Sequence, residues 1–225
     1  MSDAAIGTPG ASATGLRRIA VVSGGLREPS STRLLADRLA EATARNLRVR
    51  GLAVEVQFVE LREHAHDLTN MLLTGFAAPA LAAALETVTG ADGVIAVTPI
   101  FSGSYTGQFK NFFDVVGQDA LDGTPVLIGA TAGTARHSLA LEHAVRPLFA
   151  YLHAVVVPTG AFGATEDFGQ AAGSTTDDAT PLAVRVERAA RELAALVAAR
   201  EPRGPHGPAD PFALTTTFGD LIAEM

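Results

Sequence analysis

The chain has 225 residues, 48% of them hydrophobic and 18% charged, with a formal net charge of −7 and no cysteine. This length and composition predict one α/β domain with a large core, and the lack of cysteine excludes disulfides and thiolate sites. Because the basic residues are spread along an acidic chain, we expect no nucleic-acid partner. The apolar runs are too short for a bilayer, so we expect no membrane association.

Residues 1–16 are small and polar, which predicts a flexible N-terminal tail. They lack the basic-then-apolar order of a signal peptide, so a cytoplasmic location is expected. Hydrophobic patterns then predict five strands, at 18–22, 54–59, 93–98, 125–131 and 153–157. Apolar stripes at helical spacing predict helices at 31–46, 78–89, 107–117, 137–152 and 181–199.

This alternation of strands and helices predicts a parallel, doubly wound sheet with right-handed crossovers. The strand at 54–59 alternates polar and apolar residues, which is typical of a sheet edge that is wet on one side. An edge position for the second strand favours the order 2-1-3-4-5 over the dinucleotide-binding order 3-2-1-4-5. The domain is expected over 17–200. Residues 201–225 form a tail that either docks on its own or a neighbouring subunit or is a disordered end.

Ligands of such sheets bind beyond the C-terminal ends of the strands, and the loop after the first strand has the composition of an anion site. Two glycines follow Ser23, and Ser30, Ser31 and Thr32 arrive where a helix begins. The free N–H groups and hydroxyls there suit a phosphate monoester, with Arg27 nearby. A plain helix N-cap is the alternative. The loop matches neither the Walker A nor the G-x-G-x-x-G pattern.

The loop after the third strand carries two rings, Phe101 and Tyr105, among small hydroxylated residues. We expect Pro99 to end the strand, because proline has no N–H for the ladder. This surface suits a flat heteroaromatic ligand with polar edges. An ordinary βα turn with both aromatics in the core is the alternative.

The loop after the fourth strand, 131–137, again combines glycine with hydroxyl groups. Gly133 would let backbone approach a ring edge, Thr134 could donate a hydrogen bond, and His137 could stabilise negative charge on the ring. A turn capped by Thr134 explains the same residues.

In this order the segments SGGLREPSST, TPIFSGSYTGQFKNFFD and ATAGTARH resemble the NAD(P)H-dependent FMN reductase family of flavodoxin-like proteins, over roughly 17–200. The likeness is greatest to two-component reductases that supply reduced flavin to monooxygenases. It implies a flavodoxin-like five-stranded sheet, FMN and NADPH or NADH as cofactors, hydride transfer to FMN, and a homodimer or homotetramer. A quinone, azo or nitro reductase and a flavodoxin-like electron carrier stay open as alternatives.

The resemblance also assigns cofactor-binding residues, and none of them is expected to be a catalytic acid or base. The FMN phosphate would be held by Ser23, Arg27, Ser30, Ser31 and Thr32. The isoalloxazine would be lined by Pro99, Ile100, Phe101, Ser102, Gly103, Ser104 and Tyr105, and edged by Thr131, Ala132, Gly133, Thr134 and His137. Phe101 departs from the tyrosine common in the family.

Six ionisable residues need separate interpretations. Lys110 and Asp114 match family positions that would brace the site or a subunit contact. Arg27 or Arg136 could contact a 2′-phosphate, which would give a preference for NADPH. His64 and His66 have a spacing that can bind metal on a strand, but they lack a third ligand, so no metal site is expected.

The acidic pair Glu166 and Asp167 lies in a predicted Gly/Ser/Thr/Asp-rich loop at 159–179. It could border the mouth of a substrate pocket or a subunit interface. A plain surface loop is the favoured interpretation.

Overall fold

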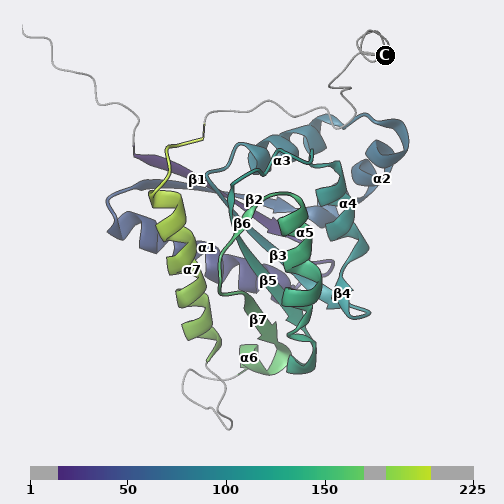
Figure 1. Ribbon diagram of the computed structural model, residues 1–225. Helices are drawn as coiled ribbons and strands as arrows, with labels where there is room; N and C mark the ends of the chain where they lie inside the picture. The colour runs from purple at the N-terminus through teal and green to yellow at the C-terminus, as the bar shows by residue number, and fades with distance from the viewer. Residues whose placement is uncertain (1–14, 170–180, 204–225) are drawn as a thin grey trace, which may run out of the picture.

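Seven strands form the sheet of the computed structural model, which describes residues 15–169 and 181–203 (Figure 1). They are β1 Leu16–Ser23, β2 Ala53–Glu60, β3 Gly93–Phe101, β4 Ser104–Tyr105, β5 Pro125–Ala132, β6 Val155–Val156 and β7 Ala161–Ala164. The main path runs β2-β1-β3-β5-β6 with parallel pairing. This confirms the predicted order, in which β5 and β6 are the fourth and fifth strands, and it confirms β2 as an edge.

The prediction of only five strands was wrong, because β4 pairs antiparallel with β3 and β7 pairs parallel with β5. β4 is two residues long, and β7 reads AFGA, so neither carries the period of two that marks a strand in a sequence. The predicted strand at 153–157 is also shorter than expected. His153 has φ +55° and lies outside it.

Seven α-helices and three shorter helical turns connect the strands in the described ranges. The α-helices are α1 Ser31–Val49, α2 Ala65–Thr74, α3 Pro79–Thr89, α4 Gly107–Val115, α5 Arg146–Tyr151, α6 Thr165–Gly169 and α7 Leu182–Ala198. The turns are η1 Leu61–His64 and η2 Ala135–His137, which are 3₁₀ helices, and η3 Leu141–Val145, which is a π-helix.

The single helix predicted at 137–152 was wrong, since η2, η3 and α5 occupy this segment in turn. Pro147 lies in the first turn of α5 and has no N–H to donate one turn back. The preceding turn is wider, with π-type bonding. Helix α2 was not predicted, because it buries only two side chains, Leu68 and Met71.

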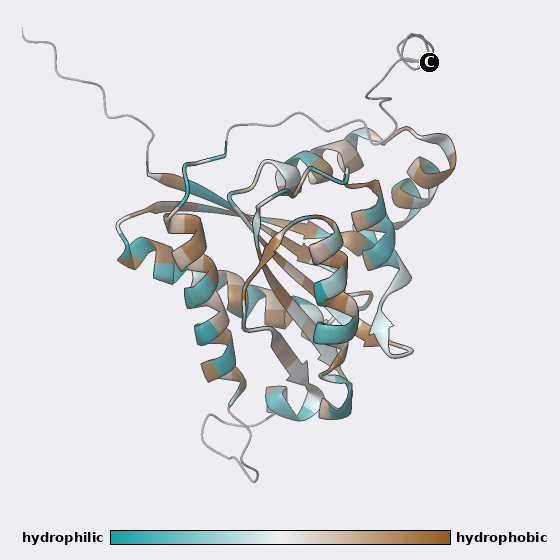
Figure 2. Ribbon diagram, viewed as in Figure 1, coloured by the Kyte–Doolittle hydropathy of each residue, from teal (hydrophilic) through white to brown (hydrophobic). Residues whose placement is uncertain are grey.

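Helices cover both faces of the sheet (Figure 1), and the central strands are coloured mainly as hydrophobic in Figure 2. Two separate groups of buried apolar side chains lie between the sheet and the helices. Ile95 and Val97 of β3 pack with α1 and α7, whereas Val94 and Ala96 pack with α3, α4 and α5. Both faces of a central parallel strand are therefore apolar, as its continuous hydrophobic run predicts. The rings of Phe109, Phe112, Phe113 and Phe149 form the largest aromatic group on the second face.

The described chain ends with a short segment that crosses the N-terminal edge of the sheet. Asp92 accepts hydrogen bonds from the Arg18 N–H at 2.7 Å and the Arg203 N–H at 2.5 Å. The buried Arg17 donates to the carbonyls of Val197 and Arg200. These bonds place residues 200–203 against β1. Most of the two predicted tails, 1–16 and 201–225, lies outside the described residues, including the apolar part of the second.

In the described residues, no single helix has the length and apolar character to cross a membrane. One pair, Leu61–Thr74 with Pro79–Thr89, meets these two criteria when taken together but bends by 92°.

Candidate functional site

The strand register brings the predicted site loops to one edge of the sheet. Ser23 at the end of β1 pairs with Val97 of β3, and Pro99 of β3 pairs with Thr131 of β5. Thr131 in turn pairs with Gly163 of β7. The exits of four strands therefore lie side by side, and the exit of β7 is one that the sequence did not predict.

Two polar links join the first loop to the other strands. The Gly24 N–H donates to the Val97 carbonyl at 2.8 Å. The hydroxyls of Thr32 and Thr131 are 2.8 Å apart and buried. Thr32 therefore reaches across the site, and its hydroxyl is already bonded to the third loop.

Ser30 is the N-cap of α1, as the capping alternative predicts. Its Oγ accepts from the Arg33 N–H at 3.1 Å and lies where a Cβ on Gly25 would stand only 2.3 Å away. Glycine is therefore needed at position 25 for the serine to cap the helix. The cap leaves the N–H groups of Ser31 and Thr32 without an acceptor in the described part of the chain, at the positive end of the helix.

Ser23 adds an unusual buried group to this loop. Its side chain is fully buried, and its Oγ has no hydrogen-bond partner among residues 15–169 and 181–203. A buried hydroxyl without a partner costs free energy, so its position calls for a further polar group. Arg27, in contrast, is exposed.

The second loop is a β-hairpin, and the expectation that Pro99 ends the strand was wrong. Strand β3 continues to Phe101, and Pro99 takes the last pair of the ladder with β5, where a missing donor costs least. Ser102 at φ +52° and Gly103 at φ +81° form the two-residue turn between β3 and β4. Positive φ at both positions is the type I′ turn that joins such strands.

The two rings of this hairpin lie in different environments. Phe101 is 53% exposed, whereas Tyr105 is half-buried, with its ring centroid 6.0 Å from that of Phe109. Ile100 points into the core, and Ser104 is half-buried. Thr98 fixes the base of the hairpin, because its hydroxyl accepts from the Thr106 N–H at 3.3 Å.

The third loop has the predicted cap and an open backbone. The Thr134 side chain accepts from the Arg136 N–H at 3.4 Å, at the start of η2. A Cβ on Gly133 would meet nothing within 4 Å, so a planar group has access to the backbone here. Ala132 is half-buried, whereas Arg136 and His137 are exposed.

Two cavities border these loops. A cavity of about 250 Å³ at the first loop is lined by Gly25, Arg27, Glu28, Pro29, Ser30, Arg33, Leu34, Asp37, Glu60 and Arg62. A cavity of about 770 Å³ lies between the hairpin, α4 and α5, with Ser104, Tyr105, His143 and Tyr151 in its wall. Lys110 and Asp114 form an ion pair in that wall. This pairing is compatible with their predicted bracing role.

The exit of β7 and the segment after β2 contain contacts that the sequence did not predict. Asp167 accepts from the Ala164 N–H at 2.8 Å and from Arg185 at 3.0 Å, so it orders α6 beside the third loop. Glu166 is exposed in the same short helix. His64 and His66 lie at the η1–α2 junction, and the described residues contain no cluster of three metal-ligating side chains.

The chain is similar in sequence to known FMN reductases. It is 36% identical over 171 residues to the NADH-dependent FMN reductase SfnE of Pseudomonas putida, covering 76% of this chain and 89% of that protein. It is 33% identical over 183 residues to an FMN reductase (NADPH) of Pseudomonas aeruginosa, covering 81% and 94%.

Solved structures show the same fold. An oxidoreductase from Corynebacterium diphtheriae has a TM-score of 0.78 and 45% identity over 84% of this chain and all of that one. The NADH:FMN oxidoreductase EMOB has a TM-score of 0.68 and 25% identity, covering 84% and 96%. Residues 17–169 match the sequence pattern of NADPH-dependent FMN reductase, and this stretch includes all three loops. The chain therefore belongs to the NADPH-dependent FMN reductase family.

Proposed function

We propose that this protein is an NAD(P)H-dependent FMN reductase, in which the nicotinamide of NADPH or NADH gives a hydride to FMN at the C-terminal edge of the sheet. The observation that carries the proposal is that three loops of an FMN reductase sequence lie together at the exits of β1, β3 and β5, where the Ser23 hydroxyl is buried and has no partner among the described residues. That hydroxyl, the N–H groups at the start of α1 and Arg27 fit a phosphate, which offers several acceptor oxygens.

The remaining predicted residues would hold and orient the ring. Hairpin residues 99–105 would line one side of it, and the open backbone around Gly133 would lie at its edge. When bound, FMN supplies the hydride acceptor and the nicotinamide supplies the hydride. The protein's contribution is therefore distance and orientation, which can account for large rate effects without a protein acid or base.

The same resemblance leads us to propose a cytoplasmic homo-oligomer that passes reduced FMN to a flavin-dependent monooxygenase. Apolar side chains near the site support a subunit contact, since Phe101, Leu139 and Tyr151 are 53%, 64% and 67% exposed. Light scattering coupled to gel filtration measures the oligomeric state directly. A monomer at all concentrations would contradict this part of the proposal.

Purified protein tests the main proposal. FMN and riboflavin binding is measured by flavin fluorescence, and NADPH or NADH oxidation is followed with FMN, a quinone or a dye as acceptor. We expect FMN to bind more tightly than riboflavin and to accelerate oxidation of the reduced nicotinamide. Absence of flavin binding in both redox states would overturn the proposal. Bound FMN without nicotinamide oxidation would identify an electron carrier instead.

A further inference from the structure

The first loop contains a carboxylate that an anion site would not be expected to have. Glu28 lies two residues before the N-cap Ser30, and both residues line the cavity of about 250 Å³. The Glu28 side chain is 73% exposed, so it is free to approach a ligand in this loop. A phosphate carries up to two negative charges at neutral pH, so a phosphate in this loop and the Glu28 carboxylate would repel each other.

An arginine from a different part of the fold pairs with this carboxylate. Arg62 belongs to η1, which begins where β2 ends, and its guanidinium donates to the Glu28 carboxylate. This hydrogen bond, with the positive charge of Arg62, lowers the pKa of Glu28 below its ordinary value. Glu28 is therefore ionised at neutral pH, and Arg62 provides the compensating charge.

Three other charged groups of the cavity, Arg33, Asp37 and Glu60, are paired with one another. Arg33 contacts Asp37 at 2.8 Å and Glu60 at 2.5 Å, and its guanidinium lies 4.1 Å from the centre of the Phe58 ring. Among the described residues, Arg62 is the cation that pairs with Glu28. Arg27 is exposed and forms no ion pair with a described residue, which leaves it available to a ligand.

We propose that Arg62 is a positioning residue for the FMN phosphate: it holds and neutralises Glu28 so that Arg27 and the start of α1 meet the phosphate without a competing carboxylate. This inference rests on the proposed function. Arg62 acts through Glu28 and need not touch the flavin. Its effect should therefore be confined to ligands that carry the phosphate.

A purely structural role for the pair leads to a different expectation. Exposed ion pairs contribute little to stability. Loss of such a contribution would leave the affinities for FMN and riboflavin unchanged. If the loop were disturbed, it would weaken both affinities by the same factor. Comparison of FMN with riboflavin, which has the same ring but no phosphate, separates the two roles.

The test measures FMN and riboflavin dissociation constants for the full-length protein and for R62A, E28Q and the double variant R62A/E28Q. R62A should weaken FMN about five- to tenfold, less at high salt, and change riboflavin by less than about twofold. E28Q in the R62A background should restore FMN affinity, because it removes the uncompensated charge. R45A, which breaks the Arg45–Glu187 pair at 2.7 Å between α1 and α7, is the matched control and should not alter either constant.

The outcomes separate this inference from the proposed function. Unchanged FMN affinity in R62A, equal weakening of both flavins, or no rescue by E28Q would overturn the role of Arg62 while leaving a flavin-binding protein. Absence of flavin binding by the wild-type protein would overturn both.

Discussion

Helix α1 contains two buried threonine hydroxyls, of which one has a hydrogen-bond partner and the other has none among the described residues. Comparing them measures what a single hydrogen bond contributes to stability. Thr32 bonds to Thr131 at 2.8 Å, whereas the Oγ1 of Thr43 has no partner among the described residues, although both side chains are buried. A paired hydroxyl stabilises the fold, and a buried hydroxyl without a partner destabilises it. The Thr32–Thr131 bond also fixes the distance between the first and third loops.

We therefore expect T131V to lower the free energy of unfolding by about 1–2 kcal/mol, since it leaves the Thr32 hydroxyl buried and unpaired. T43V, the same change in the same core, should leave stability unchanged or raise it. Urea unfolding followed by circular dichroism measures both. Equal destabilisation by the two variants would show that the Thr32–Thr131 bond has no special contribution.

One arginine adds polar contacts that join the π-helix η3 and helix α5 to the connection between β6 and β7. Arg146 donates to both oxygens of Glu142 one turn earlier, at 2.6 and 2.9 Å, and also to the carbonyls of Val157 and Pro158. The hydrogen bond from Arg146 lowers the pKa of Glu142 below its ordinary value. Glu142 thus orients the side chain that ties this irregular helix to the connection between β6 and β7.

A lowered carboxyl pKa sets the direction of the pH dependence. The stabilisation is complete above the unfolded-state pKa, near 4.3, and is lost as the pH falls through the lower folded-state pKa. E142Q should therefore reduce the free energy of unfolding by roughly 0.5 kcal/mol at pH 7, because the Glu142 side chain is 49% exposed, and its difference from the wild type should shrink toward pH 3.

Thermal or urea unfolding at the two pH values measures this difference. Glu41 is the control, since it is 79% exposed and 3.8 Å from Arg45. E41Q should have no measurable effect at either pH. A difference between E142Q and wild type that persists undiminished at acid pH would exclude the ion pair as its cause.

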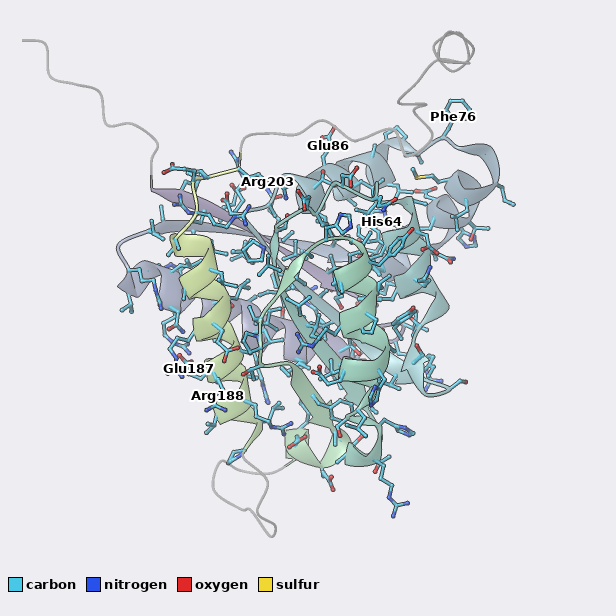
Figure 3. All side chains as sticks on the ribbon, viewed as in Figure 1. His64, Phe76, Glu86, Glu187, Arg188 and Arg203 are labelled. Atoms are coloured by element: carbon cyan, nitrogen blue, oxygen red, sulfur yellow. The ribbon has the colours of Figure 1, made fainter. Side chains whose placement is uncertain are left out.

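At the scale of the whole molecule, residues 200–203 connect the end of α7 to the N-terminal edge of the sheet (Figure 3). This edge is opposite the candidate site. Asp92 has donors from β1 and from this segment, and Arg203 also contacts Thr124 ahead of β5. Arg17 is only 5% exposed and uses the carbonyl of Arg200. The segment therefore adds hydrogen-bond partners to two buried charged groups, the Arg17 guanidinium and the Asp92 carboxylate.

Two truncations test whether residues 200–203 stabilise the fold. A chain ending at Arg203 keeps these contacts, whereas a chain ending at Ala199 loses them, and we expect the second to be less stable by about 1–3 kcal/mol. FMN affinity should be equal in the two proteins, because the loops that we propose bind flavin lie at the other edge. Melting temperatures that coincide would contradict the stabilising role.

Much of the fold follows from local patterns. Continuous apolar runs such as 93–97 predict buried strands, and their alternation with helical stripes predicts the layers and the order of the sheet. Where the pattern is absent the prediction failed, as in β7, which is only four residues long and reads AFGA, and in the helix that Pro147 interrupts. The turn at Ser102–Gly103 was missed because Pro99 suggested an earlier end to the strand.

The sequence by itself determined the family and singled out the three loops that we propose carry the site, because motif spacing and strand ends are local properties of the chain. Only the tertiary structure decided how these loops are held. The Thr32–Thr131 bond joins residues 99 positions apart, and the Arg62–Glu28 pair joins residues 34 positions apart. Such contacts depend on strand register and on the packing of helices on the sheet, which no local pattern contains.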